Sequence, residues 1–368
     1  MTGGAGFVGS HCVLSLLECG HRIVVVDNLS NAICNDVNHN ALPESLRRIE
    51  LLTGKKLTEF YNVDLRDEKA VLDIFTHHDF EAVMHFAGLK AVGESALKPL
   101  DYYENNVAGS INLMKAMRKH GVRKMIFSSS ATVYGMPKYL PIDEKHPVGF
   151  TVTNPYGRTK FFIEEILRDL AASEKGWCIV SLRYFNPIGA HESGEIGEDP
   201  QGIPNNLMPF ISQVAIGRRP VLKVFGNDFK TKDGTGVRDY IHIMDLAKGH
   251  VMALDKIIKE NWAGYNAINL GNGIGLSVLE VLSLFSIGFY SFAFNFHPAF
   301  QVVKAFEEAT GVKVPYEIVE RRPGDVDAMY ADNRKAIKLL GWKPVHDIKA
   351  MCKHTWRWQS KNPSGFRE

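Results

Sequence analysis

Apolar positions in the first half of the chain alternate between short runs typical of buried strands and longer segments with helical spacing. The short runs predict strands at residues 23–27, 82–87, 124–128 and 178–184. The helical spacing predicts helices at residues 44–52, 68–75, 101–118 and 155–170. Strands that alternate with helices in this way predict an α/β protein with a Rossmann-type doubly wound parallel sheet.

The rhythm changes after Asn186, where glycine and proline become frequent. Such a stretch is typical of loops and short elements that cover one end of a sheet. We therefore expect residues 1–185 to form a dinucleotide-binding Rossmann domain. Residues 186–368 are expected to form mainly a smaller C-terminal α/β domain for the substrate, with some segments returning to the first domain.

Composition narrows the class of protein. The 368 residues are 45% apolar, which is enough for a folded core, and the formal net charge is only +2. Because no block of lysine or arginine suggests a nucleic-acid surface, we expect a small-molecule partner. Five scattered cysteines without a Cys-x-x-Cys spacing argue against disulfides and against a metal site. Nothing in the first thirty residues resembles an export signal, so we expect a cytoplasmic protein.

Two segments depart from the regular pattern. Only Met1 precedes the glycine-rich loop, although such a loop normally follows a central strand, so we expect a truncated first strand. Residues 281–301 carry a run of aromatic residues and interrupt what otherwise reads as one helix from Ser277 to Thr310. The polar residues of this run and Pro298 leave it short of the roughly 20 apolar residues that a membrane span requires. We interpret it as an insert.

Glycines recur at every third position in the opening loop, at Gly3, Gly6 and Gly9, and a helical segment follows. Missing side chains at these positions let backbone N–H groups approach a pyrophosphate at a helix N-terminus. The strand 23–27 ends in Asp27, whose carboxylate can accept hydrogen bonds from ribose hydroxyls. An acid at this point favours NAD over NADP. An ordinary tight turn is the alternative, and the following helix, strand and acid count against it.

Polar side chains follow other predicted strands. Asp64 can meet the adenine edge or cap a surface helix, and both explanations stay open. Lys90 can reach a cofactor hydroxyl or phosphate, or it can be an ordinary solvated lysine. Ser130 follows the strand 124–128, where a hydroxyl can relay a proton from a substrate, although serine clusters also form turns.

Tyr156 and Lys160 stand four residues apart just after Pro155, which can open a helix, so their side chains share one helical face. A neighbouring ammonium favours phenolate and lowers the pKa of a phenol from its ordinary value of about 10. Each residue alone is better explained as part of an amphipathic helix. Together with the glycine loop, they predict oxidation of an alcohol, in which the cofactor takes hydride and Tyr156 takes the proton.

These motifs occur together in the extended short-chain dehydrogenase/reductase family, which the chain resembles from Thr2 to about Gly275 and again from Val303 to Phe366. The likeness is greatest to those epimerases of the family that act on UDP-hexoses. It is carried by long matches at residues 85–95, 127–135, 154–157, 183–191, 197–210, 234–242 and 356–366.

The resemblance implies NAD as cofactor and assigns site residues position by position. It places the active-site trio on Ser130, Tyr156 and Lys160. Together with the glycine loop, it implies NAD contacts at Gly3, Gly6, Phe7, Val8, Gly9, Asp27, Asn28, Asn31, Asp64, Leu65, Phe86, Lys90, Lys160 and Tyr184. It implies nucleotide-sugar contacts at Ser130, Ala131, Thr132, Tyr184, Phe185, Asn186, Asn205, Asn206, Leu207, Lys223, Val224, Phe225, Arg238, Arg322, Asp325 and Met329.

The implied substrate contacts suit a UDP-hexose. Arginines such as Arg238 and Arg322 present a charged fork to a diphosphate, and Phe225 can pack against a uracil face. Asp325 can bind ribose or sugar hydroxyls. Met329 stands where members of the family vary in side-chain size beside the sugar, so acceptance of N-acetylated UDP-sugars stays open.

The resemblance also implies an activity: inversion of C4 of UDP-galactose or UDP-glucose through a transient 4-keto sugar, in a homodimer. A nucleotide-sugar 4,6-dehydratase is the nearest alternative. Related dehydratases place Asp-Glu after the serine or threonine, whereas Ala131 and Thr132 stand here. A binding protein that senses NAD without chemistry is the other alternative, and the intact Tyr156 and Lys160 count against it. The segment 281–301 has no counterpart in the family.

Overall fold

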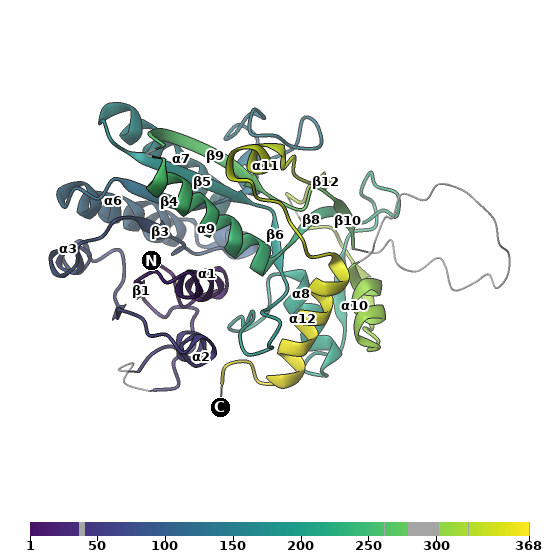
Figure 1. The fold of residues 1–368 in the computed structure, drawn as a ribbon. Helices are drawn as coiled ribbons and strands as arrows, with labels where there is room; N and C mark the ends of the chain where they lie inside the picture. Colours follow the sequence, from purple (N-terminus) through teal and green to yellow (C-terminus); the bar gives the residue numbers. More distant parts are fainter. Residues whose placement is uncertain (37–40, 261, 279–301, 323, 368) are drawn as a thin grey trace, which may run out of the picture.

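A parallel sheet forms the centre of the molecule (Figure 1). The computed structural model describes residues 1–36, 41–260, 262–278, 302–322 and 324–367. The strands of this sheet lie in the order β2 (Glu59–Asn62), β1 (Val24–Asp27), β3 (Val83–His85), β4 (Lys124–Ser130), β5 (Cys178–Tyr184) and β9 (Gly264–Leu270). Strands β1 and β3 are joined through residues 1–2.

Met1 and Thr2 occupy the centre of the sheet, where Thr2 forms isolated β-bridges and not a regular strand. Thr2 forms parallel bridges to Val26 in β1 and to His85 in β3. The Thr2 backbone N–H donates to the Met84 carbonyl at 3.0 Å, and the Phe86 N–H donates to the Thr2 carbonyl at 3.0 Å. The glycine loop therefore starts at the carboxyl edge of the sheet, where ligands of open α/β sheets bind.

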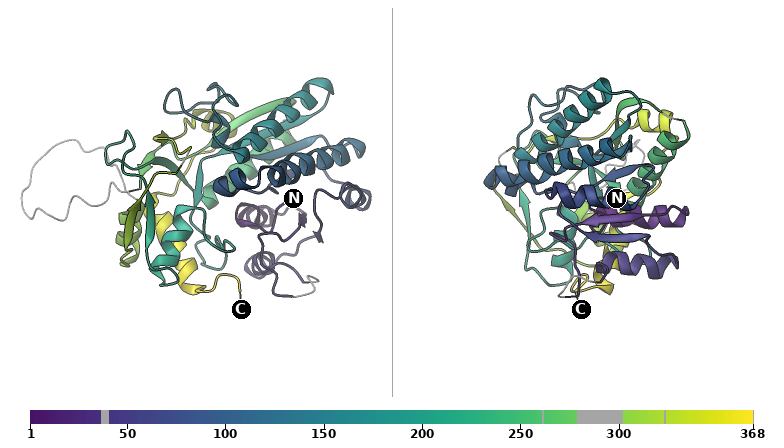
Figure 2. Two further views of the ribbon diagram at one scale, coloured as in Figure 1. Left: turned by 180° about the vertical axis from the view of Figure 1, so that it is seen from behind. Right: turned by 90° about the vertical axis from the view of Figure 1, so that its left-hand side faces the viewer.

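Apolar side chains on both faces of the sheet explain why helices cover each face. Neighbouring residues of one strand, such as Ile126 and Phe127 in β4, are buried in two different clusters because successive side chains point to opposite faces. One face is covered by α1 (Phe7–Glu18), α2 (Glu44–Thr53) and α9 (Ile243–Lys259). The other face is covered by α3 (Glu68–His77), α6 (Gly109–Lys119) and α7 (Pro155–Ser173). Figure 2 shows these layers from two further sides. The expected doubly wound α/β fold is confirmed.

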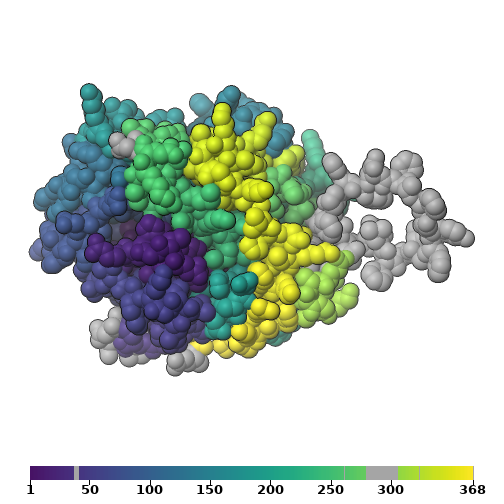
Figure 3. Space-filling model, viewed as in Figure 1, coloured from purple at the N-terminus to yellow at the C-terminus, as the bar shows by residue number. Residues whose placement is uncertain are grey.

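A second group of elements lies beyond the carboxyl edge of β5. Its strands are β6 (Asn186–Ile188), β8 (Val237–His242), β10 (Gly275–Ser277) and β12 (Ala328–Met329) in one sheet, and β7 (Leu222–Phe225) paired with β11 (Tyr316–Val319). Its helices are α8 (Leu207–Ala215), α10 (Val302–Thr310) and α12 (Ile348–Lys361), whereas Ala336 and Leu340 of α11 (Arg334–Leu340) join the core cluster on the first face of the main sheet. Figure 3 shows the C-terminal segment, in yellow, packed over the teal and green parts of the chain.

The chain returns to the main sheet after β8 and again at α11. After β8, helix α9 packs on the first face of the main sheet, and β9 pairs with β5 in parallel. The expected start of a helix at Ser277 is wrong, because Ser277 lies in β10 and pairs with Val237 of β8. The interpreted insert at 281–301 lies outside the described residues. In the described part of the chain, no helix combines the length and apolar content needed to cross a bilayer.

The helix expected at 101–118 is present, but it is not uniform. It consists of α5 (Pro99–Tyr102), a π-helical turn η1 (Tyr103–Ala108) and α6, and the short helix α4 (Val92–Leu97) precedes it. The π-helical turn carries Asn106, whose buried side chain accepts from the Leu89 N–H at 2.8 Å and donates to the Leu89 carbonyl at 3.0 Å. The wider turn therefore holds the loop after β3, as π-helical turns at functional sites often do.

Candidate functional site

Close packing explains two of the three glycines in the opening loop. A Cβ on Gly3 would lie 2.5 Å from the Ala87 nitrogen, and one on Gly9 would lie 2.1 Å from the Gly3 carbonyl oxygen. Gly3 also has a φ of +67°, which L side chains rarely adopt. A Cβ on Gly6 would meet only the Gly3 oxygen, at 3.6 Å. Packing within the protein therefore does not require Gly6, and the missing side chain leaves open space at the N-terminus of α1.

Carboxylates stand at the ends of β1 and β2, beside this loop. Asp27 accepts from the Ala5 and Leu29 N–H groups, both at 3.0 Å, and burial raises its pKa. Asn28 donates to Asp64 at 2.8 Å. Hydrogen bonds from Arg66 hold the pKa of Asp64 well below its ordinary value. The structure therefore brings Asp27, Asn28 and Asp64 together, whereas Asn31 lies exposed in the loop that follows.

Ser130 and Tyr156 meet where the N-terminus of α7 packs against the end of β4. The Asn154 side chain caps α7 by accepting from the Gly157 N–H at 2.8 Å, and Pro155 occupies the first turn. A Cβ on Gly157 would lie 2.7 Å from Val152 and 3.2 Å from Thr132, so only glycine permits this approach. The Tyr156 phenol lies near enough to the Ser130 side chain for Ser130 to lower its pKa.

The proton of the Ser130 hydroxyl is available to Tyr156. Ser130 Oγ accepts from the Thr132 N–H at 3.2 Å, and the Thr132 hydroxyl lies 3.0 Å from it. A serine oxygen that accepts hydrogen bonds still has its own hydrogen to donate. Thr132 belongs to the short 3-10 helix η2 (Ala131–Tyr134), where Ala131 is buried.

Burial, rather than Lys160, dominates the pKa of Tyr156. Desolvation raises that pKa above 10, and the hydrogen bond with Ser130 lowers it in part. The direction is opposite to the lowering expected from an adjacent ammonium. Lys160 is 4% exposed, and its Nζ donates to the Ser128 carbonyl at 2.7 Å. Burial lowers the pKa of Lys160 to about 8, against an opposing effect of Glu164.

A buried ion pair lies one helical turn beyond Lys160. Glu164 and Arg183 are 0% and 2% exposed, and the guanidinium of Arg183 makes two hydrogen bonds to Glu164, at 2.9 Å and 2.6 Å. Ser129 donates to Glu164 at 2.6 Å, and Arg183 also donates to the Tyr134 hydroxyl at 3.0 Å. Burial alone would lower the pKa of Arg183, but the contacts with Glu164 raise it above its ordinary value.

His250 links two of the expected cofactor residues and was missed from the sequence. This fully buried side chain accepts from the Tyr184 hydroxyl, and its ring centroid lies 5.0 Å from that of Phe86. Its other ring nitrogen lies 2.8 Å from the Leu246 carbonyl, to which it donates. His250 lies in the middle of α9, far along the chain from both partners, so local sequence held no signal for it.

The remaining expected cofactor residues surround the glycine loop. The ammonium of Lys90 lies 6.0 Å from the centroid of the Phe7 ring and pairs with Glu198 at 3.0 Å. Val8 packs against the first core cluster, and Leu65 is buried in the second. The side chains of Val8 and Leu65 therefore contribute to the core on opposite faces of the sheet.

Arginine side chains gather around Asp325 in the second group of elements. Arg322 pairs with Asp325 at 3.0 Å, and Arg238 of β8 lies 3.8 Å from the same carboxylate. The guanidinium of Arg322 lies 4.7 Å from the Phe225 ring centroid, and that of Arg321 lies 3.9 Å from the Phe229 ring centroid. The structure thus brings together four of the expected substrate residues.

Met329 connects this cluster to the end of β4. It pairs in register with Arg238 and packs against the cluster that contains Ala131 and Phe185. Asn186 lies on β6, opposite Tyr240 of β8. Two strands, β8 and β12, therefore lead from the arginines toward Ser130.

Other expected substrate residues contribute less. The Val224 side chain is 2% exposed and belongs to the core, so it can offer only its backbone to a ligand. Lys223 and Asn205 are exposed, and Leu207 is half-buried at the start of α8. Asn206 donates to Glu198 at 3.0 Å.

A glycine loop at the carboxyl edge of a doubly wound parallel sheet, beside a serine, tyrosine and lysine on β4 and α7, defines the class of short-chain dehydrogenase/reductase enzymes. A family model described as GDP-mannose 4,6 dehydratase matches residues 1–355. The UDP-glucose 4-epimerase of Bos taurus is 56% identical over 366 residues, which cover 100% of this chain and 97% of the relative. The UDP-glucose 4-epimerase of Bacillus subtilis (strain 168) is 52% identical over 367 residues, which cover 100% of this chain and 98% of the relative.

Solved structures agree with these relatives. A UDP-glucose 4-epimerase from Bifidobacterium longum in complex with NAD+ and UDP has a TM-score of 0.87 and 49% identity, covering 99% of this chain and 98% of that chain. One from Stenotrophomonas maltophila with NAD and formylated UDP-arabinopyranose has a TM-score of 0.86 and 43% identity, covering 98% and 97%. The chain belongs to the UDP-glucose 4-epimerase family, and the resemblance found in the sequence is confirmed.

Replacing Glu164 with glutamine keeps the shape of the side chain but leaves the buried Arg183 without its counter-ion. We expect Glu164→Gln to lower the free energy of unfolding by about 3–5 kcal/mol, measured by urea titration. The matched control is Glu81→Gln at an exposed position, where the pair with Lys124 at 3.1 Å contributes less than about 1 kcal/mol. Equal losses in the two variants would contradict this assignment.

Lys160 makes stability depend on pH. Because its pKa in the folded protein is about 8, below the ordinary 10.5, the folded state holds this proton less tightly than the unfolded chain. The charged lysine therefore lowers stability below about pH 8, and the penalty fades as the pH rises toward 10.5. We expect Lys160→Met to be about 1–3 kcal/mol more stable than the wild type at pH 7, with a smaller difference at pH 9.5. A stability difference between variant and wild type that does not change with pH, as expected for the exposed Lys145→Met, would count against burial as the cause of the pH dependence.

Proposed function

We propose that this protein is an NAD-dependent epimerase that inverts C4 of UDP-galactose and UDP-glucose. The approach of Tyr156 to Ser130, at the strand end beside the glycine loop, carries the proposal. Lys160 on the next turn of the same helix is held against that strand. The Bifidobacterium longum relative, solved with NAD+ and UDP, supports both ligands.

The residues around the glycine loop fit NAD. Gly6 leaves room for the pyrophosphate at the N-terminus of α1, and Asp27 lies where ribose hydroxyls would donate to it. Phe86 and Tyr184, joined by His250, would line the far side. When bound, NAD+ accepts a hydride from C4 of the sugar and returns it to the resulting 4-keto sugar.

Tyr156 supplies the acid and base. As phenolate, it takes the proton of the 4-hydroxyl, and it gives that proton back when the carbonyl is reduced. Ser130 donates a hydrogen bond that favours the phenolate, and Lys160, charged below about pH 8, favours it further. These effects oppose the rise in the pKa of Tyr156 that burial causes. The positive charge of an oxidised nicotinamide would also lower this pKa.

The arginines would hold the diphosphate while the hexose changes face. Arg238 and Arg322 surround Asp325, and Phe225 offers an apolar face for uracil. If the diphosphate stays bound, the sugar can turn about its link to it and present its other face. Return of the hydride to that face gives the epimer.

Elimination of water is disfavoured, although the matching family model is described by a dehydratase. Ala131 and Thr132 follow Ser130, and an alanine cannot act as the extra acid or base that a 4,6-dehydration needs. A binding protein without chemistry would not need a buried lysine one helical turn from a half-buried tyrosine, because burying the lysine costs stability.

We also propose a division of labour between the two halves of the chain. Residues 1–185, with α9 and β9, would bind NAD, and most of residues 186–368 would bind the UDP-hexose. We further propose a cytoplasmic location without nucleic-acid partners. Five scattered cysteines without a Cys-x-x-Cys spacing and a net charge of only +2 support these proposals.

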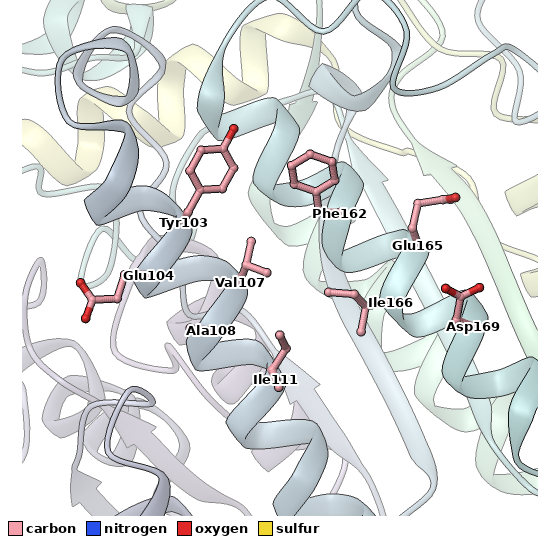
Figure 4. A pocket seen from close by; sticks show the side chains of 9 residues that line it. All are labelled: Tyr103, Glu104, Val107, Ala108, Ile111, Phe162, Glu165, Ile166 and Asp169. Carbon is pink, nitrogen blue, oxygen red and sulfur yellow. The ribbon is translucent and has the colours of Figure 1, made fainter.

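An apolar groove supports the proposed homodimer. It runs between η1 and α6 on one side and α7 on the other, and Figure 4 shows Val107 and Ile111 facing Phe162 and Ile166 across it. The groove lies on the outer surface of these helices, and the residues that line it do not include Ser130, Tyr156 or Lys160. Exposed apolar surface of this kind suits contact with the same surface of a second copy around a two-fold axis.

Tyr156→Phe tests the chemistry. Without the phenolic oxygen, we expect kcat for conversion of UDP-galactose to UDP-glucose to fall by about 100-fold to 10,000-fold, measured by coupling to a UDP-glucose dehydrogenase. The control Tyr139→Phe changes an exposed tyrosine that bonds to Asp143, and it should keep the wild-type rate. An inactive wild type, or a Tyr156→Phe enzyme with full activity, contradicts the proposed function.

Phe162→Glu tests the dimer. A carboxylate in the apolar groove should convert a dimeric wild type into a monomer at micromolar concentration, measured by sedimentation velocity. Leu51→Glu places the same charge on α2, in the helix layer on the opposite face of the sheet, and should remain dimeric. A wild type that sediments as a monomer would overturn this part of the proposal.

A further inference from the structure

One carboxylate oxygen joins the two sides of the site. Oε1 of Glu198 accepts from the Lys90 ammonium at 3.0 Å and from the Asn206 side-chain amide at 3.0 Å. Lys90 follows β3 and lies beside Phe7 of the glycine loop, whereas Asn206 precedes α8 in the second group of elements. Hydrogen bonds that involve a charged group are stronger than neutral ones, so this junction has energetic weight.

Glu198 is the fixed member of the junction. Its side chain is 10% exposed, whereas that of Lys90 is 49% exposed. The Glu198 carbonyl accepts from the Trp358 indole N–H at 3.2 Å. A Cβ on Gly197 would lie 2.4 Å from the Trp358 ring, so the loop is pressed against α12. The backbone that carries Glu198 therefore cannot shift without disturbing the buried Trp358.

Glu198 also determines what Asn206 does. Asn206 stands at the N-cap of α8, where an asparagine normally accepts a hydrogen bond from the first turn, but it makes no such side-chain bond. Its amide nitrogen is bound to Glu198 instead. The first N–H groups of α8 are therefore not capped by this side chain, and the position of the Asn206 amide depends on a carboxylate eight residues earlier.

We propose that Glu198 is a positioning residue that links the cofactor side of the site to the substrate side by holding Lys90 and Asn206 with one oxygen. The inference rests on the proposed function. Lys90, the exposed arm, can reach toward a phosphate of the cofactor, and Glu198 then keeps Asn206 and the start of α8 in place for the UDP-sugar. Loss of the Glu198 charge should weaken binding of the sugar nucleotide more than it slows the chemical step.

Glu198→Gln tests this role because it keeps the size of the side chain and removes the charge. We expect KM for UDP-galactose to rise about fivefold to tenfold while kcat changes less than about twofold. The matched control is Glu195→Gln in the same loop, which breaks an exposed ion pair with Lys361 at 3.2 Å and should leave both constants unchanged. A merely structural role would lower the thermal midpoint and the active fraction, and so would change kcat without a selective rise in KM.

A double-mutant cycle identifies the route. If Glu198 acts through Asn206, the double variant Glu198→Gln/Asn206→Ala should have a KM no higher than that of the more affected single variant. If the wild type is active, three results would overturn the inference. They are a KM in the double variant equal to the product of the two single effects, an unchanged KM in Glu198→Gln, and the same rise in KM in Glu195→Gln. An inert wild type would instead refute the proposed function, and the inference with it.

Discussion

The site depends on the close approach of the N-terminus of α7 to the end of β4. Gly157 permits that approach, Asn154 and Pro155 start the helix at the right residue, and Tyr156 then meets Ser130. A bulkier residue at position 157 would move the helix away from Thr132, and the tyrosine with it. Because a helix repeats every 3.6 residues, Lys160 and Glu164 follow on the same face. One packing contact therefore sets the positions of three functional or supporting side chains.

Charges are buried along this face in an order that serves the tyrosine. Lys160 lies between Tyr156 and Glu164, and Glu164 is itself neutralised by Arg183. Buried ion pairs seldom stabilise a protein more than apolar side chains of the same size would. Their presence one and two helical turns from the tyrosine agrees with the electrostatic environment that the proposed proton transfer would require. The pair with Arg183 keeps Glu164 from presenting a full negative charge to the site while its attraction for Lys160 persists.

Local pattern was sufficient for the parts of the site that lie on single elements. The strands β4 and β5, the start of α7 and the glycine loop all follow from spacing and from cap residues. The residues that support them could not be found in this way. Arg183, His250 and Glu198 meet partners that are 19, 66 and 108 residues away, respectively, so only the folded chain brings them together. The π-helical turn around Asn106 was missed for the same reason, because its bonds to Leu89 are made across the fold.

The pKa of Tyr156 shows a different limit of sequence reasoning. Spacing established that Tyr156 and Lys160 share a helical face, but burial sets the direction of the pKa shift, and Lys160 is not among its causes. The two halves of the site also differ in how firmly they are held. Ser130, Tyr156 and Lys160 lie on one strand and one helix, whereas Arg238, Phe225 and Arg322 come from two strands and a loop and are 20% to 52% exposed. A reaction that must address both faces of one carbon needs that combination. In the proposed reaction, the acid and base would stay fixed, and the substrate would be bound far from the reacting atom, where binding would not prevent the sugar from turning.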